Sequence, residues 1–323
     1  MHVLIIGGTQ FMGREVVRRL VARGHDVSVL HRRDHHDLGP AVHNLQADRA
    51  DLPAIGRILG DHAFDAVVDL AYDWQKGTPA GQVEASARAC AGHVQRYVFM
   101  SSIAAYGFGL DRVESDPLAP AEVPVPYVQH KAQAERALFR LHAETGLPVV
   151  TIRPPFVHGP GQPFYREAFF WDRLGDGRPV ILPDGGDTPM QWAFVDDVAE
   201  ACVRAIEVPE AVGQAFNIGH PVPVTQRAFV ETLARVAGAE PRLVPVRRAD
   251  IVAEGGRLFM ENLYFGEYLD LPPVTEVVEK VTRVLGITPT AFEDGLRRGF
   301  EWYLTQPRRP TDYAFEDRVL QRA

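Results

Sequence analysis

The sequence predicts an α/β fold: a doubly wound parallel sheet followed by a smaller, mixed α/β lobe at the C-terminal end. Three observations lead to this prediction. Short apolar runs alternate with helix-spaced segments through residues 2–152. Most of these runs are apolar almost throughout, as expected of parallel strands that are covered on both faces. Beyond residue 153, prolines and glycines break the alternation and less regular elements follow.

The first unit is a strand, a helix and a strand. The apolar run at residues 2–6 ends at Gly7 and predicts the first strand. Residues 14–23 show helical spacing, because their valines and leucine fall on one face, and Gly24 ends that helix. Residues 26–30 predict the second strand. The crossover between these two strands is expected to be right-handed.

The same alternation continues through the first domain, which we place at residues 1–153. Further helices are expected at residues 52–59, 82–93 and 129–144, and further strands at residues 66–70, 97–100 and 149–152. Together with the first unit, these elements form one parallel sheet with helices on both faces.

Residues 154–323 predict mainly a second lobe, partly interleaved with the first domain. Strands are expected at residues 180–182 and 215–218, and helices at residues 198–206 and 225–237. The last stretch, residues 306–323, is charged and contains proline. It is compatible with either a docked helix or a partly ordered end.

Composition limits the function classes. The formal net charge is −8 and the pI is about 5.8, whereas nucleic-acid binders usually carry a basic face, so no nucleic-acid partner is expected. No apolar stretch approaches the ~20 residues that span a bilayer, and no signal peptide pattern follows Met1. We therefore expect a cytoplasmic protein without a membrane partner. The two cysteines, Cys90 and Cys202, are too few for a disulfide framework or a zinc site, and no metal is expected.

The turn after the first strand has the sequence IGGTQFMG, residues 6–13. Glycine at its start permits a tight turn, and glycine at its end lets helix and strand approach closely, so that free N–H groups meet a pyrophosphate. Glutamine stands where the usual pattern has its middle glycine. The turn predicts a Rossmann-type dinucleotide site. The residues expected to contact the cofactor here are Gly7, Thr9, Gln10, Phe11, Met12 and Gly13.

The end of the second strand indicates which dinucleotide is bound. NAD enzymes usually place an acidic residue there, which accepts a hydrogen bond from the ribose 2′-hydroxyl. This chain has His31, Arg32 and Arg33 instead, and cations at this point suit a 2′-phosphate. The sequence therefore favours NADP(H) over NAD(H). Asp48 is expected to accept from the adenine amino group.

Tyr127 and Lys131 are four residues apart in a predicted helix and therefore share one face. A nearby ammonium favours the phenolate and makes the phenol useful as an acid or base. A serine at the end of the preceding strand can orient a substrate oxygen. These groups suit hydride transfer at a carbinol or ketone carbon, with the tyrosine moving the proton.

Longer motifs surround these residues. They read SSIAAYG (residues 101–107), YVQHKAQAE (127–135), RPPFVHGPG (153–161) and WAFVDDVAEA (192–201). With these motifs the chain resembles the extended short-chain dehydrogenases/reductases, the NAD-dependent epimerase/dehydratase family, in a partly atypical form. The resemblance covers nearly the whole length.

The resemblance implies roles for individual residues. Ser102, rather than Ser101, would complete a catalytic triad with Tyr127 and Lys131. Leu70, Ala71 and Pro154 would contact the cofactor, and Tyr72, Tyr106, Met190 and Trp192 the substrate. The resemblance also implies a homodimer that pairs through the helices at residues 82–93 and 129–144.

The chain departs from the family pattern at five positions. Gln10 replaces a glycine, Ile6 replaces the usual threonine, His31 replaces the aspartate typical of NAD enzymes, and Asp69 stands where many members have histidine. Met190 replaces the arginine that holds the substrate diphosphate. Arg178, Arg257 or a nearby lysine could take over that contact.

Three functions remain open at this stage. The first is a sugar-nucleotide, or related sugar, epimerase or reductase; Ile103 and Ala104 argue against a dehydratase, which often carries an acidic pair there. The second is an NADPH-dependent reductase of a non-nucleotide ketone, which Met190 and several aromatic residues favour. The third is a non-catalytic member that binds RNA or a protein, which the atypical glycine turn suggests. The aromatic residues concerned are Phe164, Tyr165, Phe169, Phe170 and Trp171.

Overall fold

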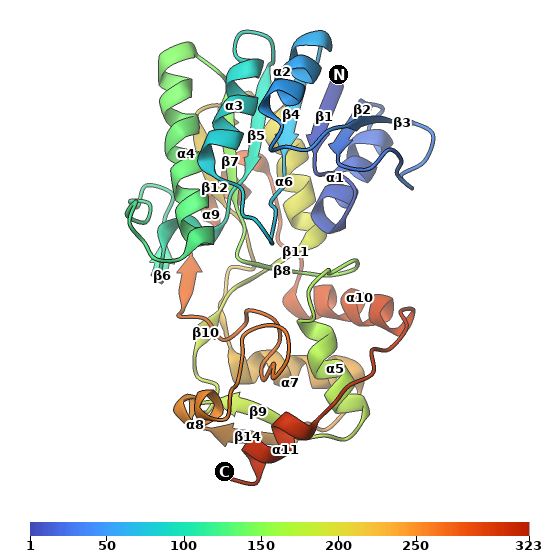
Figure 1. Ribbon diagram of the computed structural model, residues 1–323, viewed down its shortest axis with the longest axis vertical. Coiled ribbons are helices and arrows are strands. Elements are labelled where there is room, and N and C mark those ends of the chain that lie inside the picture. Colours follow the sequence, from blue (N-terminus) through green and yellow to red (C-terminus); the bar gives the residue numbers. More distant parts are fainter. Residues whose placement is uncertain (323) are drawn as a thin grey trace.

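The computed structural model describes residues 1–322 and contains a sheet of seven parallel strands (Figure 1). The strand order is β12-β7-β5-β4-β1-β2-β3. This arrangement confirms the predicted α/β class. The strands are β1 (His2–Ile6), β2 (Asp26–His31), β3 (Val42–Gln46), β4 (Ala66–Asp69), β5 (Arg96–Met100), β7 (Val149–Arg153) and β12 (Gln214–Asn217).

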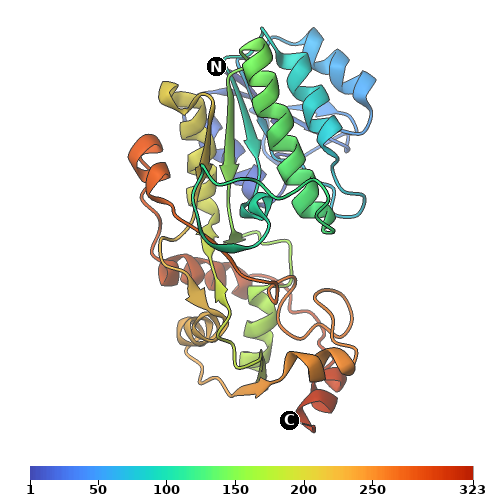
Figure 2. The ribbon, with the colours of Figure 1, turned by 90° about the vertical axis from the view of Figure 1, so that its left-hand side faces the viewer.

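Helices cover both faces of this sheet (Figure 2). Val3 and Ile5 of β1 pack into the core beneath one layer, and Leu4 and Ile6 into the core beneath the other. Because successive side chains of a strand point to opposite faces, both faces need apolar residues, which explains the unbroken apolar run. One layer consists of α1 (Phe11–Ala22), α6 (Val195–Glu207) and α9 (Glu279–Leu285), and the other of α2 (Leu52–Asp61), α3 (Ala80–Cys90) and α4 (Pro126–Thr145).

The order in which the chain adds strands to the sheet changes direction at β1: β2 and β3 lie on one side of it, and β4, β5, β7 and β12 lie on the other. This strand pairs with β2 on one side and with β4 on the other. In open α/β sheets, ligands bind beyond the carboxyl ends of the strands at such a switch point. The loops that follow β1, β2, β4 and β5 are therefore the first place to look for a site.

The second lobe lies beyond this carboxyl edge (Figure 1). Phe170, Trp192 and Phe229 are fully buried in its core. Its helices are α5 (Glu167–Gly175), α7 (Gln226–Ala237), α8 (Arg248–Ala253), α10 (Phe292–Leu304) and α11 (Ala314–Leu320). Short strand pairs complete the structure: β8 (Phe156–His158) with β11 (Trp192–Phe194), β9 (Val180–Pro183) with β14 (Leu243–Val246), β10 (Pro189–Met190) with β13 (Val224–Thr225), and β6 (Gly109–Arg112) with β15 (Val274–Glu276).

The chain returns to the sheet after entering the lobe. The elements α6, β12 and α9 all follow residue 153 in sequence, yet they pack on the sheet. The end of the chain docks on the lobe instead: Phe315 and Val319 of α11 join its core, and Glu316 lies 2.7 Å from Arg173. No helix among residues 1–322 is long and apolar enough to cross a membrane.

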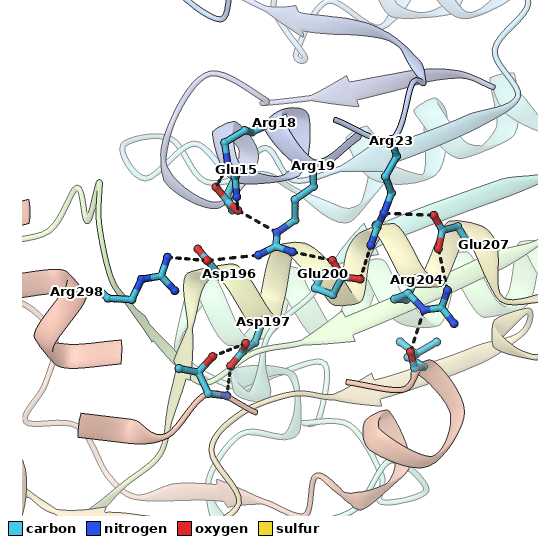
Figure 3. Close-up of polar contacts among 12 residues, drawn as sticks. Glu15, Arg18, Arg19, Arg23, Asp196, Asp197, Glu200, Arg204, Glu207 and Arg298 are labelled. Atoms are coloured by element: carbon cyan, nitrogen blue, oxygen red, sulfur yellow. Dashed lines mark hydrogen bonds and ion pairs between the residues drawn. The ribbon is translucent and has the colours of Figure 1, made fainter. Parts of the chain in front are cut away.

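Ion pairs connect the two parts of the molecule (Figure 3). Arg19 of α1 contacts Glu200 and Asp196 of α6 at 2.7 and 3.4 Å. Asp196 also pairs with Arg298 of α10 at 2.8 Å. Asp197 accepts hydrogen bonds from the backbone N–H and the hydroxyl of Thr290, just before α10. These contacts join a helix of the lobe to the helices that cover the sheet.

Candidate functional site

The turn between β1 and α1 has no room for side chains at its glycines, and Gly7 and Gly13 show why. Gly7 has a φ of 91°, and a Cβ added there would lie 3.0 Å from Ala71, in the loop after β4. A Cβ on Gly13 would overlap the carbonyl oxygen of Gly7. The two glycines therefore let the start of α1 and the loop after β4 approach the turn closely.

The N-terminus of α1 presents unused backbone donors. Gln10 is the N-cap residue, but its side chain makes no capping hydrogen bond, and the first turn contains no acidic residue. Phe11 has a φ of 39°, in the left-handed region that a bulky side chain rarely occupies. Such strain persists where the local structure enforces it, often at ligand sites. A helix N-terminus without a side-chain cap and without an acidic residue in its first turn is suited to bind the pyrophosphate of a dinucleotide.

Cations surround the end of β2. Arg32 and Arg33 are exposed, and the Arg32 guanidinium lies 3.3 Å from the Asp73 carboxylate across the loop after β4. His31 forms a hydrogen bond of 2.6 Å with the Asn44 side chain. The two guanidinium groups are therefore accessible at the position where the 2′ substituent of a bound dinucleotide is expected.

The remaining residues predicted to contact the cofactor lie around the same edge. Asp48 is exposed, in the loop between β3 and α2, and accepts from the backbone N–H of Ala50 at 2.9 Å. Leu70 is half-buried directly after β4. Pro154 is buried, and its carbonyl oxygen accepts from the Ser102 hydroxyl at 3.4 Å.

Tyr127 and Lys131 lie one helical turn apart at the start of α4, where Pro126 is the first helical residue. The buried Lys131 ammonium donates to the carbonyl oxygen of Met100, at the end of β5, at 2.6 Å. It lies 5.7 Å from the centroid of the Tyr127 ring. Burial lowers the pKa of Lys131 to about 8. The group is therefore mostly an ammonium at neutral pH and loses its proton as the pH rises through about 8.

Groups from several parts of the chain change the pKa of the Tyr127 phenol. Burial raises its pKa, whereas the Ser102 hydroxyl and the positive charge of Arg166 act in the opposite direction. Ser102 follows β5, and Arg166 precedes α5. The two adjacent serines differ: the Ser101 hydroxyl donates to the buried Glu135 carboxylate, whereas the Ser102 hydroxyl lies beside Tyr127.

Four aromatic side chains gather around the Tyr127 phenol, and we call them the aromatic cluster. Trp74 stacks on Tyr127, with ring centroids 5.0 Å apart, and Tyr72 meets Tyr127 edge-on at 4.9 Å. Phe164 and Tyr268 lie 5.0 and 6.4 Å from Trp74. Because Trp74 is 53% exposed, an aromatic surface lies open to solvent beside the phenol.

Arg166 is the charged group next to this cluster. Its Cζ lies 4.6 Å from the centroid of Phe164 and 5.2 Å from that of Phe156. Sequence reasoning did not select Arg166, Trp74 or Tyr268 as site residues, and it named Phe164 only among the aromatic residues that favour a non-nucleotide ketone. Of the three residues that it missed, only Trp74 had a usable signal, because it follows a strand end at the switch point.

Three of the predicted substrate residues lie away from the aromatic cluster; only Tyr72 belongs to it. Tyr106 is buried, donates to Asn217 at 2.7 Å and accepts from Arg153 at 2.6 Å. Met190 and Trp192 are buried in the core of the lobe. The structure gives these three residues packing and hydrogen-bonding roles.

Asp69, at the end of β4, is fully buried. It accepts hydrogen bonds from Arg49 and, at 2.8 Å, from the hydroxyl of Tyr97. The Asp69–Arg49 ion pair therefore lies at the position where many members of the family that the sequence resembles have histidine. No group of three or more His, Cys, Asp or Glu side chains within residues 1–322 is arranged to hold a metal ion.

Comparison with known proteins adds an independent finding. Residues 3–219 match the model of the NAD dependent epimerase/dehydratase family. The chain is 26% identical to the chloroplast stem-loop binding protein of 41 kDa b from Arabidopsis thaliana, over 99% of this chain and 84% of that protein. It is 29% identical to a UDP-glucose 4-epimerase from Mycolicibacterium smegmatis, over 88% of this chain and 97% of that enzyme. Among solved structures, Pal from Bacillus thuringiensis has a similar fold, with a TM-score of 0.76, 23% identity, and coverage of 94% of this chain and 99% of that one.

Proposed function

Because the chain belongs to the NAD-dependent epimerase/dehydratase family, we propose that it catalyses hydride transfer at a carbinol or ketone carbon with Tyr127 as the acid or base. The observation that carries this proposal is the grouping of Tyr127, Lys131 and Ser102 at the carboxyl edge of the sheet. A bound nicotinamide supplies the hydride donor or acceptor. The chain supplies the proton and the orientation.

The proton steps follow from the three side chains. The Tyr127 phenolate accepts the proton of a carbinol, and in the reverse direction the Tyr127 phenol donates its proton to a ketone oxygen. The positive charge of Lys131 stabilises the phenolate, and its hydrogen bond to Met100 fixes its position. The Ser102 hydroxyl already has two partners, the backbone N–H of Ala104 and the carbonyl oxygen of Pro154. It can also donate to a substrate oxygen by rotating away from the latter, weaker contact at 3.4 Å.

For the cofactor, NADP(H) in preference to NAD(H) is part of the proposal. Arg32 and Arg33 support it, because both guanidinium groups are exposed at the end of β2 and His31 occupies the position of the usual acid. The adjacent Asp73 carboxylate is the group with which a 2′-phosphate would compete for Arg32.

For the substrate, we propose a sugar nucleotide or a related sugar, acted on by epimerisation or reduction. The family match and the similarity to a UDP-glucose 4-epimerase support this choice. A second candidate is a non-nucleotide ketone. The aromatic cluster favours it, because the rings of Trp74 and Tyr72 lie against Tyr127 and offer apolar surface to a substrate.

The proposal is tested with purified protein, the dinucleotide in its reduced form (NADPH or NADH) or its oxidised form (NADP⁺ or NAD⁺), and two substrate panels: 4-keto nucleotide sugars and UDP-sugars in one, neutral aryl and alkyl ketones in the other. We expect loss of NADPH absorbance or an isomerised product with one panel, and no reaction for Tyr127→Phe. A wild-type protein that transfers no hydride with either panel, although it binds the dinucleotide, contradicts the proposal. Identification of any dinucleotide that copurifies separates retained NAD⁺, expected of an epimerase, from an exchangeable NADPH.

The proposal includes a homodimer formed through α3 and α4. These helices pack side by side on one face of the sheet and have an outer surface that no other part of the described chain covers (Figure 2). Ala85, Ala89 and Phe139 are half-buried on these two helices.

A further inference from the structure

Arg166 is a buried cation without an acidic partner. Its side chain precedes α5, and the residue is only 9% exposed. Its Nε donates to the carbonyl oxygen of Glu267 at 3.1 Å. Its two Nη atoms have no hydrogen-bond or ion-pair partner within residues 1–322. Neither Nη atom is fully enclosed by the protein, so both reach an accessible surface.

The surroundings of Arg166 are mostly aromatic. Phe156 and Phe164 lie against the guanidinium, and the charges of Glu167, Glu267 and Tyr127 act on it at longer range. Burial raises the pKa of Glu167 to about 7, so that this carboxyl is only partly ionised at neutral pH. An almost buried guanidinium without an anion is costly, because desolvation is not offset by pairing.

The position of Arg166 relates it to the proposed chemistry. Phe164 connects it to Trp74, with 5.0 Å between those ring centroids, and Trp74 stacks on Tyr127. The charge of Arg166 is also close enough to lower the pKa of Tyr127. An anion on Arg166 would therefore lie near a substrate carbon that reacts beside Tyr127.

The other two candidate arginines lie elsewhere. Arg178 pairs with Asp317 of α11, and its guanidinium lies 4.7 Å from the Tyr313 ring. Arg257 is exposed, in the loop after α8. Met190, where the family arginine was expected, is buried in the core of the lobe. Arg166 is thus the arginine that combines burial, free Nη donors and proximity to Tyr127.

We propose that Arg166 binds an anionic group of the substrate, a phosphate or a carboxylate, in place of the arginine that is missing at position 190. This inference rests on the proposed function for the identity of the reacting site. It assigns Arg166 as a specificity-determining residue, and it restricts the substrate to molecules with an anionic oxygen pair near the reacting carbon. A planar guanidinium suits both anions, because each presents two oxygens to its fork of N–H donors.

The test measures binding and turnover separately. UDP represents the phosphate source, and a set of short 3-oxocarboxylates represents the carboxylate source. Titration calorimetry gives Kd for each probe with wild type, Arg166→Lys and Arg166→Gln. Arg235→Gln serves as the matched control, because Arg235 is an exposed arginine of the lobe that pairs with Glu293.

We expect one probe class to bind the wild type and Arg235→Gln equally. Arg166→Gln should raise its Kd by about 10- to 100-fold, the loss expected for a charge-assisted hydrogen bond. Arg166→Lys should lie in between, and the affinity for NADPH should not change. The same anion should raise the melting temperature of the wild type but not of Arg166→Gln, which also shows whether the variant is folded.

Two outcomes overturn the inference: neither anion binds the wild type, or Arg166→Gln binds the anion as tightly as the wild type does. Either can occur while neutral ketones are still reduced, and then the proposed function stands without this inference. Conversely, if an anion binds through Arg166 but no hydride is transferred to any probe, the anion site is supported and the proposed function is contradicted. Tyr127→Phe should bind the anion normally and fail only in turnover.

Discussion

At the scale of single residues, Lys131 shows how burial tunes the chemistry of the site. Its ammonium has one oxygen partner, the Met100 carbonyl, and lies near the rings of Phe99, Tyr72 and Tyr127. Desolvation lowers the pKa of Lys131 to about 8, against the pull of Asp69. Below that pH the group is a cation that stabilises the phenolate, and above that pH it becomes a neutral amine.

This titration predicts an alkaline limit of activity. The value of kcat/KM should fall as the pH rises through about 8, because the ammonium loses its charge there. Lys131→Arg keeps the positive charge at all accessible pH values and should move that fall to higher pH. The measurement is a pair of pH–rate profiles. Equal profiles for both proteins would show that another group limits the alkaline side.

A second prediction at this scale concerns cofactor choice. Arg32→Ala should raise the Kd of NADPH by about tenfold through loss of one charge-assisted contact and leave that of NADH nearly unchanged. Arg32 is 67% exposed, and its one ion-pair partner within residues 1–322 is Asp73, so the fold should tolerate the change. Fluorescence titration with both dinucleotides checks this. Equal weakening of both would assign Arg32 to general phosphate attraction and remove the argument for NADP(H).

At the residue scale, the sequence indicates which side chains lie close together where spacing along the chain carries that information. The i, i+4 relation brings Tyr127 and Lys131 together, and the strand end brings Ser102 to them. The sequence does not identify Arg166, which lies in a loop rich in proline and glycine and approaches the site only through tertiary packing. Among the clustered aromatic residues near Arg166, Phe169 and Phe170 are fully buried core residues, whereas Phe164 borders Trp74.

At the scale of elements, the β1–α1 turn supports a matched pair of substitutions. Gly13→Ala places a methyl group against the Gly7 carbonyl oxygen and should lower the free energy of unfolding by about 1–3 kcal/mol, the usual cost of overpacking. It should also weaken dinucleotide binding, because α1 must move away. Gly56→Ala, in α2, has open space around it and should stabilise by up to about 1 kcal/mol.

Urea denaturation of the two variants, with and without NADPH, checks this pair of expectations. The argument for close approach in the turn fails if Gly13→Ala is as stable as Gly56→Ala. A Gly13→Ala variant that is stable and binds the cofactor with unchanged affinity would show that the turn can accommodate a methyl group at this position.

Most elements around the sheet follow from the sequence because their apolar patterns are strong. The helix predicted at residues 129–144 is present as Pro126–Thr145, and that at 82–93 as Ala80–Cys90. The strand β3 was not predicted. Its sequence VHNLQ has one buried residue, Val42, because β3 is an edge strand and pairs only with β2. An edge strand lacks the unbroken apolar run that identified the others.

At the scale of the whole molecule, the sequence predicts the α/β class and a lobe that is partly interleaved with the first domain, but not which elements return to the sheet. The elements α6, β12 and α9 return to the sheet from the second half of the sequence, and nothing in their periodicity distinguishes them from the lobe helices. The tail also docks: α11 contributes Phe315 and Val319 to the lobe core. Contacts between residues far apart in the sequence determine where these elements and the tail lie, and a local sequence pattern does not encode such contacts.

The proposed dimer is the prediction that involves the whole molecule. The chain mass is 35.8 kDa, so light scattering after gel filtration should give about twice that value if two copies pair through α3 and α4. Ala85→Arg places a long cation on α3, at a half-buried residue that is not part of the apolar core beneath the helix. It should give a monomer, since a buried unpaired charge opposes an interface of standard size. Gly56→Ala, on the neighbouring exposed surface of α2, should leave the mass unchanged. A wild type that is monomeric at micromolar concentration contradicts the dimer. A dimer that Ala85→Arg does not disturb places the interface on another face.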